Sequence, residues 1–176
     1  MNLKLKRTPG IYVVGFMASG KSTIGRLLAR RLGWNFFDTD EEIEAAERAA
    51  IAKIFDTRGE AEFRRIETGI IRHHVGRIER GSPAVLALGG GAFAAPANRD
   101  LLENNGVTVW LDCPFAVVER RVGLASHRPL ARDPRQFATL YHARREAYAL
   151  ADMRVPIESD DPAGVVEAIL SHPLIL

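Results

Sequence analysis

Residues 15–22 read Gly-Phe-Met-Ala-Ser-Gly-Lys-Ser and match the pattern G-x-x-x-x-G-K-[S/T] in full. They follow an apolar run at residues 10–14 and open directly into a segment whose apolar residues recur with helical spacing. A glycine-rich turn between a strand and a helix can wrap backbone N–H groups around a phosphate chain, and the helix points its positive end at the same charges. The stretch therefore predicts a phosphate-binding loop, with Lys21 at the terminal phosphates of a nucleoside triphosphate and the Ser22 hydroxyl at Mg²⁺.

Strand-like and helix-like segments alternate along the rest of the chain. The expected strands are residues 11–14, 35–37, 84–88, 107–111 and 154–157. The expected helices are residues 21–32, a helical turn at 51–55, a long amphipathic helix at 63–78 and a helix that begins with proline at 162. Thr39 or Asp40 is the expected N-cap of the helix after the second strand. This alternation predicts an α/β fold in which a five-stranded parallel sheet is flanked by helices.

Length and composition suit one globular domain over residues 1–176, with 47% hydrophobic and 26% charged residues. No apolar run approaches the roughly 20 residues of a membrane helix, so no membrane association is expected. The arginine pairs along the chain form no continuous basic stripe, so nucleic-acid binding is not indicated. One cysteine, Cys113, excludes an internal disulfide and fits a reducing cytoplasm. We expect a cytoplasmic monomer.

Two acids and three glycines follow the second and third expected strands. Asp38 and Asp40 are two residues apart, so alternation in an extended chain would send both side chains to one side. One carboxylate could hold Mg²⁺ through water while the other orients or deprotonates an attacking hydroxyl, or the pair could be a helix N-cap and a surface acid. The third strand ends in Gly89-Gly90-Gly91 without an aspartate, so Asp38 or Asp40 must supply the metal-binding acid. The glycines mark a sharp turn or a close approach to a ligand.

Charged side chains cluster near the start of the long expected helix. Glu60 and Glu67 flank Arg64 at i−4 and i+3, so both carboxylates can reach its guanidinium. Arg64 fits a solvated ion-pair network as well as it fits a ligand-binding role. His73 and His74 have no ligand-like spacing and are expected to be surface or helix residues.

Residues 123–134 interrupt the regular pattern, since they lack a period and contain two prolines. The segment could be a plain surface loop. In an enzyme that must exclude water from a phosphoryl transfer, it is a natural lid, and a mobile lid is the expected role.

Taken together, these pieces resemble the shikimate kinases from about residue 11 to about residue 170. The resemblance rests on the phosphate loop with Thr23, Phe-Asp-Thr-Asp at 37–40, Phe-Arg-Arg-Ile-Glu at 63–67, the glycines at 89–91, Arg-Pro-Leu at 128–130 and Arg144 four residues before Tyr148. Their order and spacing are more specific than any one piece after the phosphate loop. Three positions depart from the family: Ala18 stands where a third loop glycine is usual, Lys53 replaces an acid, and Ala131 replaces the leucine that commonly extends the Arg-Pro-Leu motif.

The resemblance implies a three-layer P-loop kinase fold in one domain, with a substrate-binding segment at about 38–67 and a lid at about 123–134. For the donor side, it implies that ATP binds at Gly15, Ala18, Ser19, Gly20, Lys21, Ser22 and Thr23, with Arg121 stacked near adenine and Pro162 in the adenine-contacting loop. Ser22 and Asp38 would hold the Mg²⁺.

For the acceptor side, the resemblance implies that Arg64 and Arg144 grip the substrate carboxylate, helped by the glycine-rich turn, and that Glu67 orients Arg64. The residues it implies as substrate-binding are Asp40, Arg64, Gly89, Gly90, Gly91 and Arg144. The residues it implies as catalytic are Lys21, Asp40 and Arg128. Asp40 would bind the ring hydroxyls and assist the attacking one, and Arg128 would close over the phosphates from the lid.

The implied activity is the ATP-dependent phosphorylation of the 3-hydroxyl of shikimate, which gives shikimate 3-phosphate and ADP. A related small-carboxylate kinase such as a gluconate kinase would also need a carboxylate clamp. The non-enzymatic alternative is a catalytically silent domain of the same family that binds a small acid. Lys21, Asp38 and Asp40 are all intact, which weighs against that alternative.

Overall fold

The computed structural model describes residues 10–124 and 133–175, and its strands form one sheet in the order β2-β3-β1-β4-β5. The strands are β1 (Gly10–Val14), β2 (Asn35–Asp38), β3 (Ala84–Ala87), β4 (Val107–Asp112) and β5 (Met153–Pro156). Each neighbouring pair is parallel, and Tyr12 of β1, for example, lies between Leu86 of β3 and Thr108 of β4. The prediction of a five-stranded parallel sheet is confirmed.

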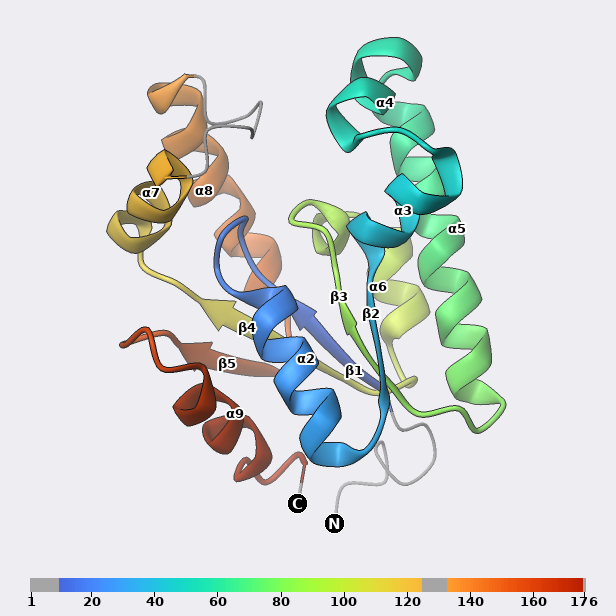
Figure 1. Cartoon of the computed structure of the whole chain (residues 1–176), viewed down its shortest axis with the longest axis vertical. Helices are drawn as coiled ribbons and strands as arrows, with labels where there is room; N and C mark the ends of the chain where they lie inside the picture. The colour runs from blue at the N-terminus through green and yellow to red at the C-terminus, as the bar shows by residue number, and fades with distance from the viewer. Residues whose placement is uncertain (1–9, 125–132, 176) are drawn as a thin grey trace.

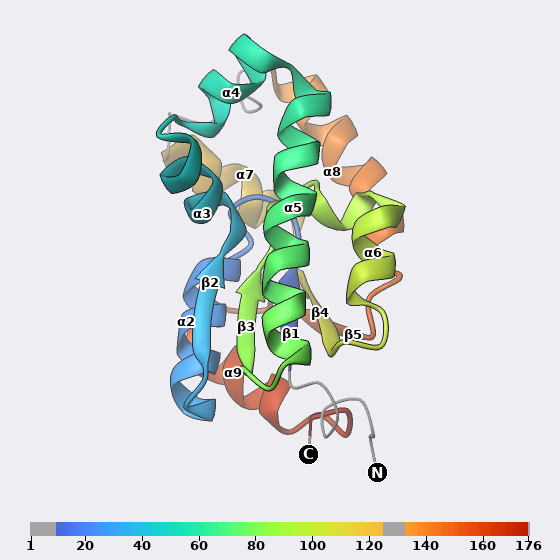
Figure 2. The same ribbon diagram turned by 90° about the vertical axis from the view of Figure 1, so that its right-hand side faces the viewer.

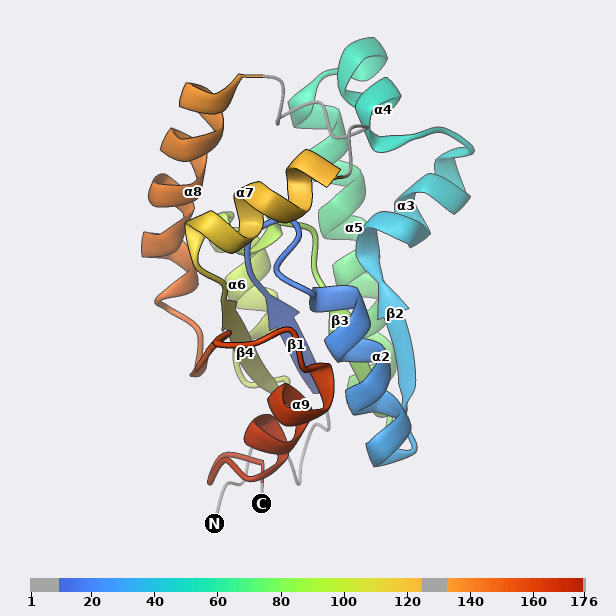
Figure 3. The same ribbon diagram turned by 60° about the vertical axis from the view of Figure 1, so that its left-hand side comes forward.

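Helices cover both faces of the sheet. They are α2 (Lys21–Leu32), α3 (Thr39–Glu47), α4 (Ile51–Arg58), α5 (Glu60–Glu79), α6 (Pro96–Leu102), α7 (Phe115–Leu124), α8 (Pro134–Tyr148) and α9 (Pro162–Leu170), with a short 3₁₀ helix η1 (Ala92–Ala94). Helices α2 and α9 lie on one face, and α5, α6 and α8 lie on the other (Figures 1, 2 and 3). Beyond the carboxyl edge of the strands, α3 and α4 stand on one side of the phosphate loop and α7 on the other (Figure 1).

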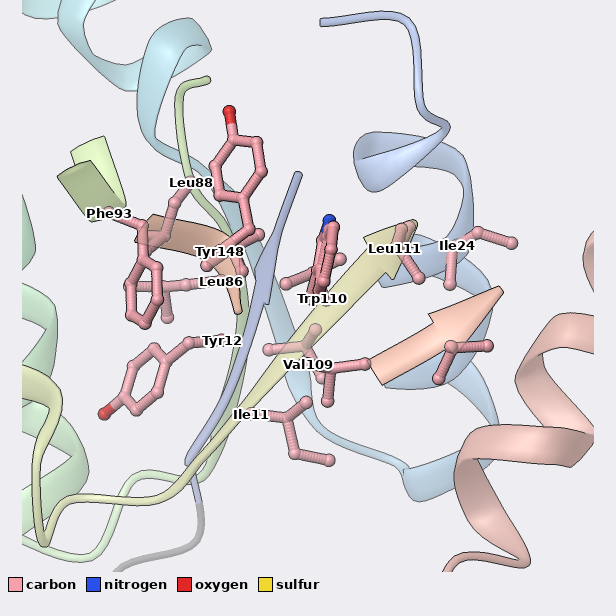
Figure 4. Packing of buried hydrophobic residues seen from close by; sticks show 14 of the residues in the cluster. Ile11, Tyr12, Ile24, Leu86, Leu88, Phe93, Val109, Trp110, Leu111 and Tyr148 are labelled. Carbon is pink, nitrogen blue, oxygen red and sulfur yellow. The ribbon is translucent and has the colours of Figure 1, made fainter. Parts of the chain in front are cut away.

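The core follows the alternation of the central strands. Figure 4 shows Tyr12, Leu86 and Phe93 together on one side of β1, whereas Ile11 and Leu111 point toward α2 and α9 on the other. All five side chains are buried, and the Tyr12 hydroxyl donates a hydrogen bond of 2.9 Å to the Asn105 carbonyl. A smaller apolar cluster joins α3, α4 and α5 through Ile43, Ile54, Phe63 and Ile66. Within the described residues, no helix is both long and apolar enough to cross a membrane.

The first turn of α3 differs from the prediction. The N-cap is Asp38, whose Oδ1 accepts hydrogen bonds from the backbone N–H groups of Asp40 (2.9 Å) and Glu41 (3.2 Å), so the expectation of Thr39 or Asp40 is wrong. Strand β2 runs through Asp38 and the helix begins at once. Asp38 and Asp40 therefore do not share an extended segment, and the argument from strand alternation does not apply to them.

The other differences concern helix ends and helices that periodicity left unassigned. The long helix begins at Glu60 and not at 63, because Gly59 adopts φ 83° and lets the chain turn directly from α4 into α5. Helices α6, α7 and α8 were not assigned from the sequence. Residues 123–124 end α7 and 133–134 begin α8, while the rest of the expected lid, including Arg128, lies outside the described residues.

His74 is a residue of helix α5, which is one of the two positions expected for it, and its side chain is buried. Its side chain is 3% exposed, its Nε2 lies 2.5 Å from Glu42 Oε2, and its ring centroid lies 4.2 Å from that of Phe37. The His74–Glu42 contact joins α5 to α3, and both helices contribute residues to the site described below.

In the phosphate loop between β1 and α2, the residue that replaces the usual third glycine has a left-handed backbone conformation. Ala18 has φ 60°, a conformation that costs a residue with a Cβ roughly 1–2 kcal/mol. The alanine thus retains a backbone shape that suits glycine, and the loop is strained but not rebuilt.

We predict that Ala18→Gly stabilises the protein. Relief of the left-handed strain exceeds the extra chain entropy of glycine, about 0.5–1 kcal/mol, and leaves a net gain of up to about 1 kcal/mol. The melting temperature should rise by about 2–4 °C per kcal/mol gained. Ala29→Gly, at a buried helical position of α2, is the matched control and should lower it. A lower melting temperature for Ala18→Gly would contradict the strain argument.

Candidate active site

The donor half of the site is the loop that connects β1 to α2. Gly15 and Gly20 have φ 151° and 99°, and the Ser19 N–H donates to the Phe16 carbonyl over 3.2 Å. Lys21 Nζ donates to the same carbonyl over 2.9 Å. The end of the loop and the Lys21 side chain are therefore both hydrogen-bonded to Phe16, near the start of the loop. Lys21 is at the N-terminus of α2, where the helix dipole favours anions.

Ser19 adds an observation that points to a ligand in this loop. Its side chain is buried, and its Oγ has no hydrogen-bond partner among the described residues. A buried hydroxyl without a partner is costly, and an anion held by the loop would supply an acceptor. Thr23 lies one turn into α2, where its side chain is exposed.

Ser22 and Asp38 meet at the lysine end of the loop. The Ser22 hydroxyl donates a short hydrogen bond to Asp38 Oδ2, while the other carboxylate oxygen caps α3. The described residues contain no group of three or more His, Cys, Asp or Glu side chains that could hold a metal by themselves. Two protein oxygens beside a phosphate loop nevertheless fit Mg²⁺, which usually keeps several waters and binds through one or two protein oxygens plus substrate phosphates.

The acceptor half of the site, where the phosphoryl acceptor is expected to bind, lies around the glycine triplet after β3. Charged side chains from several helices meet there. A Cβ atom built on Gly89 would lie 2.6 Å from Asp40 Oδ1 and 3.0 Å from Glu67 Oε2. One built on Gly91 would overlap the Arg64 guanidinium and lie 2.9 Å from Arg144 Nη2. Two carboxylates and two guanidiniums from α3, α5 and α8 therefore surround a stretch of chain that has no side chains.

Space, not backbone conformation, requires glycine at this turn. None of the three residues has a positive φ, and Gly91 has φ −96° and ψ −6°, which any residue can adopt. At Gly89 and Gly91 the close approach is made by protein side chains, and the approach of a ligand stays a prediction. Gly90 lies between the two halves, since a Cβ there would lie 3.1 Å from Arg144 Nη1, 3.6 Å from the Met17 nitrogen and 3.9 Å from the Gly15 carbonyl oxygen.

Arg64 is held in place by its own helix. Its Nη1 donates to Glu67 Oε1 over 2.8 Å, and Nη2 lies 3.6 Å from Glu60 Oε1, as the spacing predicted. Glu67 is 1% exposed, and its second oxygen, Oε2, has no hydrogen-bond partner among the described residues. Burial raises the pKa of Glu67, although the charge of Arg64 opposes this shift. The unpaired Oε2 faces the glycine triplet and can accept a hydrogen bond from a ligand there.

Arg144 comes from the opposite side. It projects from α8 to Gly90 and Gly91, and its guanidinium lies 5.8 Å from the centroid of the Phe16 ring in the phosphate loop. Burial lowers the pKa of Arg144, and burial also raises the pKa of its neighbour Tyr148 to about 12. The Tyr148 hydroxyl donates to the Gly90 carbonyl. Arg144 is therefore partly desolvated and lies between the donor and acceptor halves.

Arg121 and Pro162 lie on the far side of the phosphate loop. Arg121 Nη1 donates to the Ala18 carbonyl over 3.0 Å, and Nη2 donates to Asp160 Oδ1 over 2.8 Å. Pro162 is the first residue of α9, next to its N-cap Asp161. Arg121 thus connects α7, the loop and the segment before α9, at the edge where the base of a bound nucleotide is expected.

Sequence reasoning missed a second charged cluster, at the ends of β4 and β5. Asp112 is 7% exposed and accepts hydrogen bonds from Arg145 and Arg154. The three side chains line a cavity of about 520 Å³, together with Pro114, Phe115, Tyr141, His142, Pro156, Ile157 and Glu158. Asp112 is the last residue of an apolar strand, as Asp38 is, and that signal could have drawn attention to it.

The chain is similar to shikimate kinases in both sequence and fold. The family model for shikimate kinase matches residues 17–172. A shikimate kinase of Persephonella marina is 40% identical over 92% of this chain and 97% of its own length, and one of Ruegeria pomeroyi is 45% identical over 82% and 74%. The solved structure of shikimate kinase from Acinetobacter baumannii in complex with shikimate is 33% identical, with a TM-score of 0.86 over 94% of this chain and 93% of that one. The chain belongs to the shikimate kinase family.

Proposed function

We propose that the protein transfers the γ-phosphoryl group of ATP to the 3-hydroxyl of shikimate. The observation that carries this proposal is the ring of Arg64, Arg144, Asp40 and Glu67 around the glycine triplet, directly beside a phosphate loop. A small hydroxy acid needs planar donors for its carboxylate and acceptors for its hydroxyls, and the ring offers both. Membership of the family and the shikimate complex of the Acinetobacter baumannii relative support the same acceptor.

The two arginines bind the carboxylate of the acceptor. Arg64 approaches from α5 and Arg144 from α8, so their guanidiniums reach the triplet from different sides. Glu67 fixes the orientation of Arg64 through the 2.8 Å hydrogen bond, and its free Oε2 accepts from a ring hydroxyl. Such contacts fix the acceptor in one orientation, which converts part of its binding energy into alignment for the reaction.

Asp40 acts on the attacking hydroxyl. In the reaction the hydroxyl oxygen bonds to the γ-phosphorus, the bond from that phosphorus to the bridging oxygen breaks, and ADP leaves. Asp40 orients the hydroxyl and takes up its proton. Lys21 places positive charge at the transferring group from the donor side. In the family pattern, Arg128 supplies a further positive charge to the phosphates of the donor. We propose the same role for it here.

The residues present fit a nucleotide and a magnesium ion. Ser22 and Asp38 would hold the ion, and the loop glycines with Ser19, Lys21 and Thr23 would hold the phosphates. The bound ion would neutralise charge that builds up between the phosphates during transfer. Arg121 would stack on the base beside Pro162. A monomer in the cytoplasm remains our prediction for the assembly and location.

An activity panel tests the proposal against its alternatives. We expect ATP- and Mg²⁺-dependent ADP release with shikimate and none above background with gluconate or nucleoside monophosphates. Phosphorylation of gluconate but not shikimate would overturn the acceptor assignment. Tight binding of shikimate without any turnover would identify a silent ligand-binding domain instead.

Lys21→Ala should lower kcat by at least about 10²–10³-fold, the usual loss when one transition-state charge donor is removed. The shikimate Kd, measured by calorimetry without nucleotide, should stay within about twofold because Lys21 Nζ donates to the Phe16 carbonyl of the donor loop. Lys53→Ala, at an exposed position of α4, is the matched control and should leave kcat unchanged. A large loss of shikimate affinity in Lys21→Ala would contradict the division into two halves.

Arg144→Ala should chiefly raise the KM for shikimate. A charge-assisted hydrogen bond contributes about 1.5–3 kcal/mol, so the expected rise is about 10–100-fold, with the KM for ATP changed much less. Arg65→Ala is the control, because Arg65 is exposed and pairs with Glu62 on the outer face of α5. If the KM for shikimate stayed at its wild-type value, Arg64 alone would have to hold the carboxylate.

Gly89→Ala should lower kcat/KM for shikimate by about 10²-fold. The added methyl group would displace Asp40 and Glu67, and a shift of about 1 Å in a catalytic group is enough for such a loss. Gly69→Ala on α5 is the control, because a Cβ there meets nothing within 4 Å and alanine favours the helix. Wild-type activity in Gly89→Ala would show that the triplet tolerates a side chain.

A further inference from the structure

Two adjacent arginines on α8 point to different places. Arg144 reaches the glycine triplet, while Arg145 reaches Asp112 at the end of β4. Successive residues of a helix are rotated by about 100° around its axis, so neighbouring side chains leave it in different directions. One side of α8 thus contributes to the acceptor site and the adjoining side is bonded to the sheet.

The contact with the sheet has two hydrogen bonds between one guanidinium and one carboxylate. Arg145 Nη1 donates to Asp112 Oδ1 over 2.5 Å and Nη2 to Oδ2 over 3.2 Å, a two-point geometry that restricts rotation of the guanidinium. The same guanidinium lies 5.0 Å from the Trp110 ring centroid. Arg154 of β5 donates to Asp112 Oδ2 over 2.8 Å. Burial favours a higher pKa for Asp112, but the hydrogen bonds and charges of both arginines outweigh it and lower the pKa, so the carboxylate stays ionised.

Other contacts of α8 also orient the helix, and they include the hydrogen bond from the Tyr148 hydroxyl to the Gly90 carbonyl. Within α8, Arg145 Nη1 donates to the Tyr141 hydroxyl oxygen over 3.1 Å. The Tyr141 hydroxyl donates to the Cys113 carbonyl over 2.7 Å, and the Tyr141 and Phe137 rings meet Phe16 edge to face at 5.2 and 5.3 Å. Apolar packing resists separation of the helix but is non-directional. The two-point ion pair sits one residue from Arg144 and is directional.

A small rotation of α8 would move the ends of its side chains, including that of Arg144, by a distance that affects catalysis. Side chains extend about 5–6 Å from a helix axis, so a rotation of α8 by about 10° would move their tips by about 1 Å. A displacement of that size can cost a reaction up to about 10²-fold.

Resting on the proposed function, we propose that Asp112 and Arg145 form a positioning pair that, together with the Tyr141 and Tyr148 hydrogen bonds, sets the rotation of α8 and so places Arg144 for the carboxylate of the acceptor. Neither residue touches the acceptor. Arg154 shares the carboxylate but belongs to β5, so it supports Asp112 without holding α8.

The test compares Arg145→Met with Arg154→Met. Each variant removes one guanidinium from Asp112 and keeps an unbranched apolar stem. We expect Arg145→Met to raise the KM for shikimate by about 10-fold, with the KM for ATP within about twofold, because the effect falls on Arg144 alone. Arg154→Met should leave both KM values within about twofold, even where it lowers the melting temperature as much. Equal rises in both variants would overturn the proposal, since they would indicate general loosening.

A double-variant cycle tests whether the effect passes through Arg144. In an Arg144→Ala background, Arg145→Met should add less than about twofold to the KM for shikimate, because no guanidinium remains to be misplaced. Multiplication of the two single effects would overturn the proposal. Arg145→Lys keeps a charge near Asp112 but not the two-point geometry, and it should recover only part of the wild-type KM.

A substitute variant and the activity of the wild-type protein complete the test. If Arg145→Met does not fold, Asp112→Asn replaces it, since asparagine has nearly the same shape and keeps one acceptor oxygen; the KM for shikimate should then rise by about 3–10-fold, and a wild-type KM would overturn the proposal. If the wild-type protein does not phosphorylate shikimate, the proposed function fails and the positioning role fails with it. If the wild-type protein is active and Arg145→Met keeps its KM, only the positioning role fails.

Discussion

A methyl group at Gly91 would occupy the space of the Arg64 guanidinium, and one at Gly89 would meet the Asp40 carboxylate. The acceptor half of the site depends on this exclusion of side chains. Three helices deliver charged groups to the end of β3, and they can approach one another only because the chain there has no Cβ atoms. The turn itself has ordinary backbone angles, so the glycines are required for the volume they leave empty.

The charges gathered there pair with each other only in part: Arg64 donates to one oxygen of Glu67, and the second oxygen of Glu67 has no hydrogen-bond partner among the described residues. Glu67 is buried with one oxygen unpaired, and burial raises its pKa; Arg144 is partly desolvated, and burial lowers its pKa. Both shifts oppose the charged form, so the empty arrangement is costly. A bound carboxylate would favour the ionised arginines, and a ring hydroxyl would satisfy the free oxygen of Glu67. Stability sacrificed in this way is typical of sites that are organised before the substrate arrives.

Helix α8 connects the two halves. Its aromatic residues pack on Phe16 of the phosphate loop, Tyr148 donates to the Gly90 carbonyl, and Arg145 bonds to Asp112 at the edge of the sheet. The sheet gives this helix a rigid point of attachment, because β4 is hydrogen-bonded to a strand on either side. Under the proposed function, residues that do not contact the substrate would adjust the position of Arg144 on this helix.

The sequence by itself determined the strand-loop-helix at residues 10–32, the parallel sheet and most strand positions, because hydrophobic period and glycine placement are local properties. The family pattern also predicted which side chains gather around the triplet. Only the tertiary structure decided that Asp38 caps α3, that His74 is buried against Glu42, that Ala18 keeps a left-handed backbone and that Arg145 turns away from Arg144 to Asp112. These outcomes depend on contacts between residues far apart in the chain or on local backbone angles, and a spacing pattern records neither.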